Sequence, residues 1–288
     1  MIRSPFLRNS ALNGHSTNYY AQFLFKDCAF SYREHMQRRK RLSEIVSAVM
    51  EQRDVDVPSL ATMFEVSEAT IRRDLALLEE QRLVSRTRGG ATPNAAFNDV
   101  PLSLKHVQNA AEKEKIAERA AQYLQSARVI GMTGGTTLAA FAAQVVQRDG
   151  LTVVTNAVNI ASTLLSNPHI RVLVAGGEAR NSSQETVGPV AEAFLGDYNL
   201  DVAFLGVDGV HPQAGCTNYD PIGARVNKVL VERASRTIVL VDATKISRVA
   251  LAPVCAMTDV DVLITDARAD VQVLDEIRTL GCEVVCAS

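Results

Sequence analysis

The sequence predicts an α/β protein with two unlike domains: a small helical module that ends in a β-hairpin, then an open, mostly parallel α/β sheet. Three observations lead to this prediction. The chain has 288 residues, enough for two domains with separate cores. Residues 38–90 carry apolar side chains at helical spacing and then an alternating stretch. From residue 128 onwards, short continuous apolar runs alternate with helical patterns, which is typical of a parallel sheet covered on both faces.

Three amphipathic helices are expected in the first module. Asp56 suits the N-cap of the second helix, Pro58 fits its first turn, and Ser67 suits the N-cap of the third. The short link Glu65-Val66 between these two helices is what a helix-turn-helix requires. The three apolar stripes are Leu42, Ile45, Val46 and Val49, then Val57, Leu60, Ala61 and Phe64, then Ile71, Leu75 and Leu78.

The third helix has the composition of a DNA-recognition helix. Arg72 and Arg73 are adjacent, and Ala69 and Ala76 lie with Arg73 opposite the apolar stripe. Small residues let a helix approach the major groove, and guanidinium groups reach guanine edges or phosphates. A merely solvated charged face is the plain alternative for such a helix. The basic run 38–41 and the arginines that follow the helix favour DNA binding.

Residues 83–90 alternate between apolar and polar side chains and end in two glycines, which predicts a β-hairpin wing. Three helices and a wing make a winged helix-turn-helix. The expected DNA-contacting residues are Arg38, Ser67, Glu68, Thr70, Arg72, Arg73, Arg86 and Arg88.

Residues 38–91 resemble the winged-helix domain of the DeoR family of bacterial transcription regulators. The matching stretches are Val66 to Leu75, Leu78-Glu79 and Arg88 to Ala91. We therefore expect a winged helix-turn-helix DNA-binding domain over residues 36–91, a linker over 92–104 and an effector domain over 105–288. Residues 1–35 fit no pattern, and Met36 stands just before the basic first helix, so we expect a disordered or non-native extension there.

The composition limits the kinds of partner. The net charge is −2 and the segment 36–90 has ten Lys/Arg against nine Asp/Glu, so affinity for duplex DNA must rest on a few placed arginines and on dimerisation. There is no Trp, and aromatics make up 5%, which argues against base stacking on single strands. Five scattered cysteines without zinc-finger spacing predict reduced thiols in a cytoplasmic protein, with no metal and no cofactor.

Seven apolar runs are expected to form buried strands: residues 129–132, 151–154, 172–174, 202–205, 237–241, 262–264 and 283–285. Ligands of such sheets bind at the carboxyl ends of strands. The first run leads into Gly134-Gly135-Thr136-Thr137 at the start of a helix, where backbone N–H groups and hydroxyls suit a phosphate. Nearly all of the remaining runs are also followed by polar or glycine residues. Asp220 and Asp242 admit the alternative that they simply cap helices.

This second region also resembles the DeoR family, in its sensor domain, which is similar in fold to ribose-5-phosphate isomerase. The matching residues include Gly135-Thr136-Thr137, Val153 to Asn156, Phe204 to Gly209 and Asp242 to Lys245. The resemblance implies a phosphorylated sugar-like effector, with Lys245 pairing with the phosphate and Asp208 and Asn156 holding hydroxyls. The implied effector residues are Gly134, Gly135, Thr136, Thr137, Thr155, Asn156, Gly176, Gly177, Asp208, Asp220 and Lys245.

Three positions depart from the family pattern, and one of them, Asn227, occupies a frequent Lys position with Lys228 next to it. Thr133 stands where the family often has Asp, and Gly223 stands where it commonly has Glu, so the effector is expected to differ from those of better-known members. The sequence thus predicts a regulator and not an enzyme: a homo-oligomeric repressor of a carbohydrate or related catabolic operon, released from double-stranded operator DNA by its effector. The alternative is a sugar-phosphate isomerase with a DNA-binding appendage, which the missing acid at Gly223 disfavours because isomerisation needs a general base.

Overall fold

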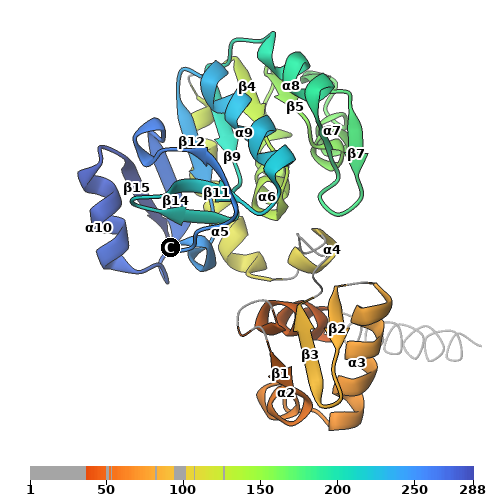
Figure 1. Ribbon diagram of the computed structural model, residues 1–288. Helices are drawn as coiled ribbons and strands as arrows, with labels where there is room; N and C mark the ends of the chain where they lie inside the picture. The colour runs from red at the N-terminus through yellow and green to blue at the C-terminus, as the bar shows by residue number, and fades with distance from the viewer. Residues whose placement is uncertain are drawn as a thin grey trace, which may run out of the picture.

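The computed structural model describes residues 37–49, 52, 54–81, 83–93, 102–106, 108–125 and 127–288. The expectations for residues 1–35 and for 94–101 of the linker lie outside these residues. Figure 1 shows a small N-terminal module beside a larger sheet domain, with α4 between them. Within the described ranges, no helix has the length and apolar character needed to cross a membrane.

The N-terminal module is a winged helix-turn-helix, as predicted. Its elements are a helix over 37–49, β1 (Val55–Asp56), α2 (Val57–Met63), α3 (Glu68–Glu80), β2 (Val84–Arg86) and β3 (Gly90–Pro93), with the strands in the order β1-β3-β2. Asp56 caps α2 by accepting from Ser59 N, and Ser67 caps α3 by accepting from Thr70 N. Ile71, Leu75 and Leu78 of α3 are fully buried, so the predicted stripe forms the core.

A buried carboxylate joins the first helix to α3. Asp74 is 1% exposed, and its two oxygens accept from Arg41 Nε at 2.7 Å and Arg38 Nε at 3.3 Å. A buried carboxylate is tolerated only when it is paired, because its desolvation is costly. These ion pairs therefore set how the recognition helix lies on the first helix.

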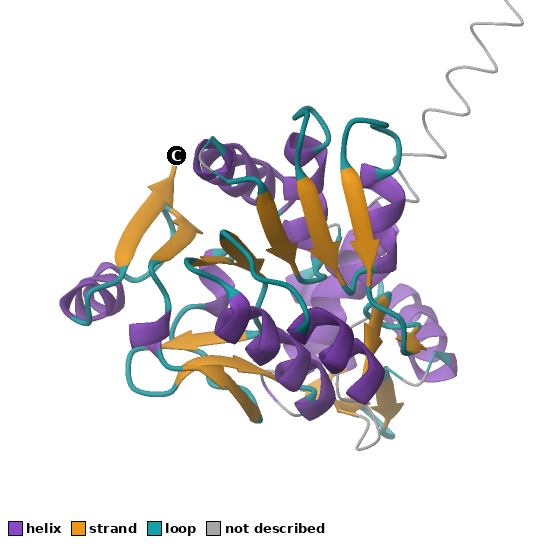
Figure 2. Cartoon of the chain, turned by 90° about the horizontal axis from the view of Figure 1, so that it is seen from above, coloured by secondary structure: helices purple, strands orange, loops and turns teal. Residues whose placement is uncertain are grey.

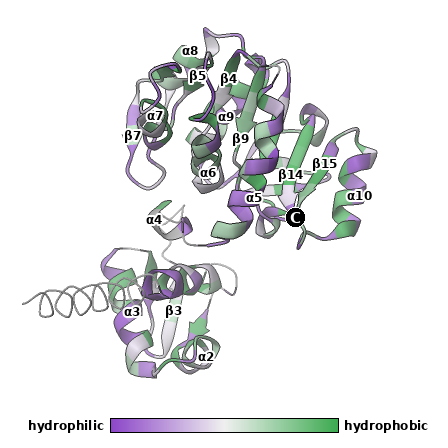
Figure 3. Ribbon diagram, turned by 180° about the vertical axis from the view of Figure 1, so that it is seen from behind, coloured by the Kyte–Doolittle hydropathy of each residue, from purple (hydrophilic) through white to green (hydrophobic). Residues whose placement is uncertain are grey.

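The larger domain is built on a seven-stranded sheet in the order β15-β14-β12-β9-β4-β5-β6, and every pairing in it is parallel. All seven predicted strands form it, with ends that differ by at most two residues. They are β4 (Val129–Met132), β5 (Thr152–Thr155), β6 (Arg171–Val174), β9 (Val202–Leu205), β12 (Thr237–Leu240), β14 (Val262–Asp266) and β15 (Glu283–Ala287). Figure 3 shows the apolar character of β9, β14 and β15 in green.

Helices cover both faces of this sheet (Figure 2). One face packs against α5 (Ala110–Ala120), α6 (Thr136–Val145) and α7 (Val158–Leu164), and there the rings of Phe141 and Phe204 lie 4.5 Å apart. The other face packs against α8 (Pro189–Gly196), α9 (Pro221–Arg233) and α10 (Val271–Thr279). Because every central strand is buried on both sides, its residues are continuously apolar.

Several short elements surround this framework. Before β4, α5 is followed directly by a 3-10 turn, η1 (Ala121–Leu124). Two small antiparallel sheets were not predicted, because their strands are short and mixed in polarity. The remaining elements are α4 (Leu102–Lys105), β7 (Glu178–Arg180), β8 (Glu185–Val187), β10 (Gly209–His211), β11 (Gly215–Asn218), η2 (Ala243–Lys245), β13 (Ala252–Cys255) and η3 (Met257–Asp259).

The Asp74 ion pairs give a test of the N-terminal module. Asp74→Ala should destabilise it by about 3 kcal/mol, since it leaves Arg41 without its buried partner. Glu80→Ala, at an exposed position of the same helix, should change the free energy of unfolding little. Urea denaturation followed by circular dichroism measures both; equal values for the two variants would contradict the role assigned to Asp74.

Candidate functional site

The central strands β4 and β9 mark the point where the chain changes direction across the sheet. From β4 the order runs outward through β5 and β6, and from β9 it runs the other way through β12, β14 and β15. Open α/β sheets bind ligands at such a point, beyond the carboxyl ends of the strands. Thr133 bridges the two strand ends here: Thr133 N donates to Phe204 O at 3.2 Å, and Thr133 Oγ1 accepts from Gly206 N at 2.9 Å.

The glycine loop after β4 presents backbone N–H groups at the start of α6. Gly135 has φ of 109°, a conformation that L side chains rarely adopt, and no side chain in the described part of the chain caps the helix. Thr136 and Thr137 follow and are buried. Gly134 N donates to Glu185 Oε1 at 2.8 Å, so a carboxylate from β8 rests against the loop. Uncapped N–H groups at a helix start attract anions.

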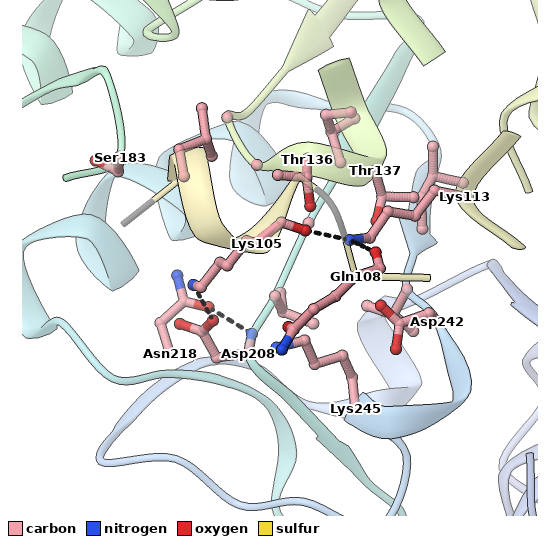
Figure 4. A pocket seen from close by; sticks show the side chains of 18 of the residues that line it. Lys105, Gln108, Lys113, Thr136, Thr137, Ser183, Asp208, Asn218, Asp242 and Lys245 are labelled. Atoms are coloured by element: carbon pink, nitrogen blue, oxygen red, sulfur yellow. Dashed lines mark hydrogen bonds and ion pairs between the residues drawn. The ribbon is translucent and has the colours of Figure 1, made fainter. Parts of the chain in front are cut away.

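Three lysines surround the cavity of about 110 Å³ that this loop borders: Lys105, Lys113 and Lys245. Lys105 Nζ lies 3.3 Å from Asp208 Oδ1, and Lys113 Nζ donates to the carbonyl oxygens of Lys105 at 2.8 Å and Gln108 at 2.6 Å (Figure 4). Among the described residues, Lys245 has no ion-pair partner within 4.0 Å. The cavity therefore contains cations that an anionic ligand could neutralise.

Burial and mutual repulsion change the pKa values of these groups. Burial lowers the pKa of Lys113 to about 8, with Asp242 opposing the shift and Lys245 adding to it. Burial, and then repulsion from Lys105, lowers the pKa of Lys245. Burial acts to raise the pKa of Asp208, but Lys105 and Lys245 outweigh it and the net pKa is lowered. An added anion would stabilise the protonated lysines.

Six of the predicted effector residues line this cavity together: Gly134, Gly135, Thr136, Thr137, Asp208 and Lys245. Asp208 is oriented by Tyr219 N, which donates to its Oδ2 at 3.2 Å. The grouping follows from the fold, because the ends of β4, β9 and β12 lie side by side in the sheet.

The other five predicted effector residues do not line the cavity and make structural contacts instead. Thr155 Oγ1 donates to Met132 O at 2.7 Å, and Asn156 Nδ2 donates to Thr186 O at 3.0 Å. Gly177 has φ of 132° and packs against Val187 O; Gly176 precedes it. Asp220 caps α9 and pairs with Arg180, which matches the helix-capping alternative. Asp242 likewise caps the 3-10 turn η2, although it also lines the cavity.

Several cavity residues were missed by the sequence analysis, namely Lys105, Gln108, Lys113, Ser183, Glu185, Asn218 and Asn227. Ser183 is 8% exposed, and its Oγ is buried without a hydrogen-bond partner among the described residues, which leaves it available to a ligand. One signal could have revealed Lys113. It stands three, four and seven positions before Ile116, Ala117 and Ala120, so a lysine occupies the buried stripe of a helix.

The predicted DNA-binding face lies on the exposed side of α3. Glu68, Ala69, Arg73 and Ala76 are exposed, opposite the buried stripe, and among the described residues Arg73 has no ion-pair partner. Thr70 is half-buried and its N–H is used in the Ser67 cap. This arrangement leaves Arg73 able to reach a base edge or phosphate.

The remaining arginines of this face are held in different ways. Arg72 Nη2 lies 2.6 Å from Glu68 Oε2, and Arg86 Nη1 lies 3.7 Å from Glu79 Oε2. Arg38 is half-exposed, and its guanidinium group pairs with the buried carboxylate of Asp74. Arg88 is exposed in the turn of the wing. Exposed pairs of this kind are worth little and exchange readily with phosphate.

A winged helix-turn-helix joined to an α/β domain with a cationic cavity defines a class, the ligand-responsive DNA-binding regulators. Comparison with known families agrees with this class. Residues 41–96 match the DeoR-like helix-turn-helix domain, and residues 108–267 match the DeoR C-terminal sensor domain. The chain belongs to the DeoR family of transcription regulators.

Curated relatives align over most of the chain. The HTH-type transcriptional regulator GlpR of Haloferax volcanii is 32% identical over 253 residues, covering 86% of this chain and 96% of the relative. The glycerol-3-phosphate regulon repressor of Escherichia coli K12 is 30% identical over 239 residues, covering 83% and 95%. Among solved structures, ribose 5-phosphate isomerase A from Methanocaldococcus jannaschii shares 20% identity over 48% of this chain and 55% of its own, with a TM-score of 0.37, a similarity too low to support further conclusions.

The titration of Lys113 predicts how anion binding depends on pH. Sulfate keeps a constant charge between about pH 7 and pH 9, whereas Lys113 loses its proton near pH 8. Sulfate affinity should therefore fall as the pH rises across this range, by up to about tenfold if the anion raises that pKa by one unit. Isothermal titration calorimetry measures it. Lys113→Met, which removes the charge and keeps the apolar stem, should bind weakly at both pH values; an unchanged pH profile in this variant would exclude Lys113.

Proposed function

We propose that the protein is a repressor that binds double-stranded operator DNA through α3 and the wing, and is released when a phosphorylated sugar-like effector enters the cavity at the carboxyl ends of β4 and β9. The observation that carries this proposal is the meeting of an uncapped glycine loop with three lysines at one cavity. Backbone N–H groups and ammonium groups together suit a phosphate, while Asp208, Asn218 and Ser183 can bond sugar hydroxyls.

The printed names of relatives support the same direction. One is a repressor of a glycerol-3-phosphate regulon, and glycerol 3-phosphate is a small phosphorylated polyol. The hydroxyl of Thr133 is used in bonds to Gly134 O and Gly206 N, so the acid often found there in the family has no substitute at that position. Glu185 instead brings a carboxylate to Gly134 from a different strand. We therefore infer an effector whose hydroxyl pattern differs from that of relatives with the acid at position 133.

In this proposal, the genes that the repressor controls belong to a carbohydrate or related catabolic operon. A homo-oligomer, dimer or larger, would place two recognition helices roughly 34 Å apart in successive major grooves. The effector lowers operator affinity by binding preferentially to a conformation in which the pair no longer fits.

The isomerase alternative has less support. Relatives of about one-third identity over most of the chain are named as regulators. Lys113 and Asp208, which stand in the cavity, are engaged with backbone carbonyls and with Lys105 respectively. Incubation with pentose and hexosamine phosphates, with product detected by chromatography, discriminates between the two: turnover would favour the isomerase.

A ligand screen tests the effector class. Phosphorylated sugars and polyols should raise the melting temperature of the full chain, while their unphosphorylated counterparts should not. A ligand at a hundred times its dissociation constant stabilises the fold by about 2.7 kcal/mol. Stabilisation by the free sugars alone would contradict a phosphate site at Gly134–Thr137.

Lys245 should separate effector response from DNA binding. Lys245→Ala removes a cation from the cavity and should abolish release by the effector found in the screen, while operator affinity stays unchanged. Lys228→Ala, an exposed lysine of α9, serves as the matched control and should respond like the wild type. Fluorescence anisotropy with labelled operator measures both; normal release of the Lys245 variant would refute its assigned role.

Arg73 should read the operator sequence. Arg73→Ala is expected to lose about 1–3 kcal/mol of specific binding if its guanidinium pairs with a guanine edge. Arg278→Ala, an exposed arginine of α10, is the control for loss of one positive charge. Anisotropy titrations with specific and scrambled duplexes distinguish the outcomes: an equal loss on both duplexes would mean that Arg73 contacts phosphate only.

A further inference from the structure

A short segment between the two domains forms part of the cavity wall. We call it the strap: α4, His106, Gln108 and Asn109. Leu102, Lys105 and Gln108 of the strap line the cavity. Leu102 N donates to Ser182 O at 2.8 Å, and Asn109 Nδ2 donates to Asp242 Oδ1 at 3.2 Å. The strap is thus bonded to the sensor domain at two points, Ser182 and Asp242.

The same strap touches the DNA-binding domain. Gln108 Nε2 donates to Ser47 Oγ at 2.9 Å, and Ser47 lies on the helix over 37–49. That helix carries Arg41, whose Nε lies 2.7 Å from the buried Asp74 of α3. A continuous set of contacts therefore leads from the cavity wall to the recognition helix.

Charge sets the position of the strap. Lys105 Nζ pairs with Asp208 Oδ1 at 3.3 Å, with side chains 21% and 18% exposed, and Lys113 Nζ holds the carbonyls of Lys105 and Gln108. An anion at the glycine loop competes with Asp208 for Lys105 and with the two carbonyls for Lys113. Partly buried charges respond strongly to such competition, because the local dielectric constant is low.

Asn109 provides the turn at the end of the strap. Its φ is 51°, in the left-handed region, which Asn tolerates better than most residues. It is held by Asp242 and by Arg268 Nη1, which donates to its Oδ1 at 3.2 Å. The rigid α5 begins directly after it. Asn109 is thus anchored to the sensor domain by two side chains at the end of the strap.

We propose that the strap transmits effector binding to the DNA-binding domain: an anion in the cavity draws Lys105 away from Asp208, the strap shifts, and Gln108 releases Ser47. The winged helix-turn-helix then loses the orientation that operator binding requires. This inference rests on the proposed function and adds the residues that couple its two sites. Lys105 acts at the ligand end, and Gln108 with Ser47 acts at the DNA-binding end.

A double-mutant cycle in the absence of any ligand tests the coupling. Lys105→Met and Ser47→Ala alter opposite ends of the strap, and operator affinity is measured by anisotropy with a duplex that the wild type selects from a random library. Each single variant should weaken binding by about fivefold. The double variant should weaken it no further, because each change alone already frees the strap. Losses that multiply to about twenty-five-fold, or no loss in either variant, would overturn the proposal.

A second measurement adds the anion. Sulfate at a concentration that saturates the cavity should weaken operator binding by the wild type more than chloride at equal ionic strength. The Ser47→Ala variant should show no difference between the two salts, and Lys228→Met should behave like the wild type. Equal sulfate effects on the wild type and Ser47→Ala would overturn the strap. Failure of the wild type to select any duplex would instead refute the proposed function, so the two failures are distinguishable.

Discussion

The strand order reverses between the neighbouring strands β4 and β9 at the centre of the sheet, and the rest of the molecule depends on this constraint. Two parallel strands that lie side by side but continue in opposite directions leave their following loops without a covering crossover. Thr133 ties the two loops together through Gly206 N, and this bond sets the spacing between the glycine loop and Asp208. The site exists because the strand order places these loops together.

The positive charges that line the cavity are only partly compensated by carboxylates. Burial lowers the pKa values of Lys113 and Lys245, which means that the fold keeps these ammonium groups at some cost. Carboxylates compensate for only part of that cost: Asp208 is paired with Lys105, and Glu185 rests on Gly134 N. An anion that replaces these internal partners would relieve the repulsion, which supports the proposal of a phosphorylated effector.

The DNA-binding domain also contains a buried charge, but there the charge is paired within the domain. Asp74 faces inward from the recognition helix and takes its charge partners from the first helix, so the arginines on the outer side of α3 remain outside the core. Few positive charges are needed for affinity when they are placed on one exposed face, which is consistent with a chain whose net charge is only −2. The Ser47–Gln108 contact then joins this domain to the sensor.

The sequence by itself determined what depends on neighbouring residues. Apolar periodicity located the three helices of the first domain, and continuous apolar runs located all seven strands of the main sheet. The caps at Asp56 and Ser67 and the glycine loop could be recognised because capping and turn chemistry act within a few residues. Six of the eleven expected effector residues line one cavity, because the fold places the ends of β4, β9 and β12 side by side. Only the tertiary structure decided that the side chains of Thr155 and Asn156 donate to backbone carbonyl groups. It also decided that Lys105 pairs with Asp208, 103 residues away. Such contacts depend on strand order and on the path between the domains, and no local pattern encodes either of them.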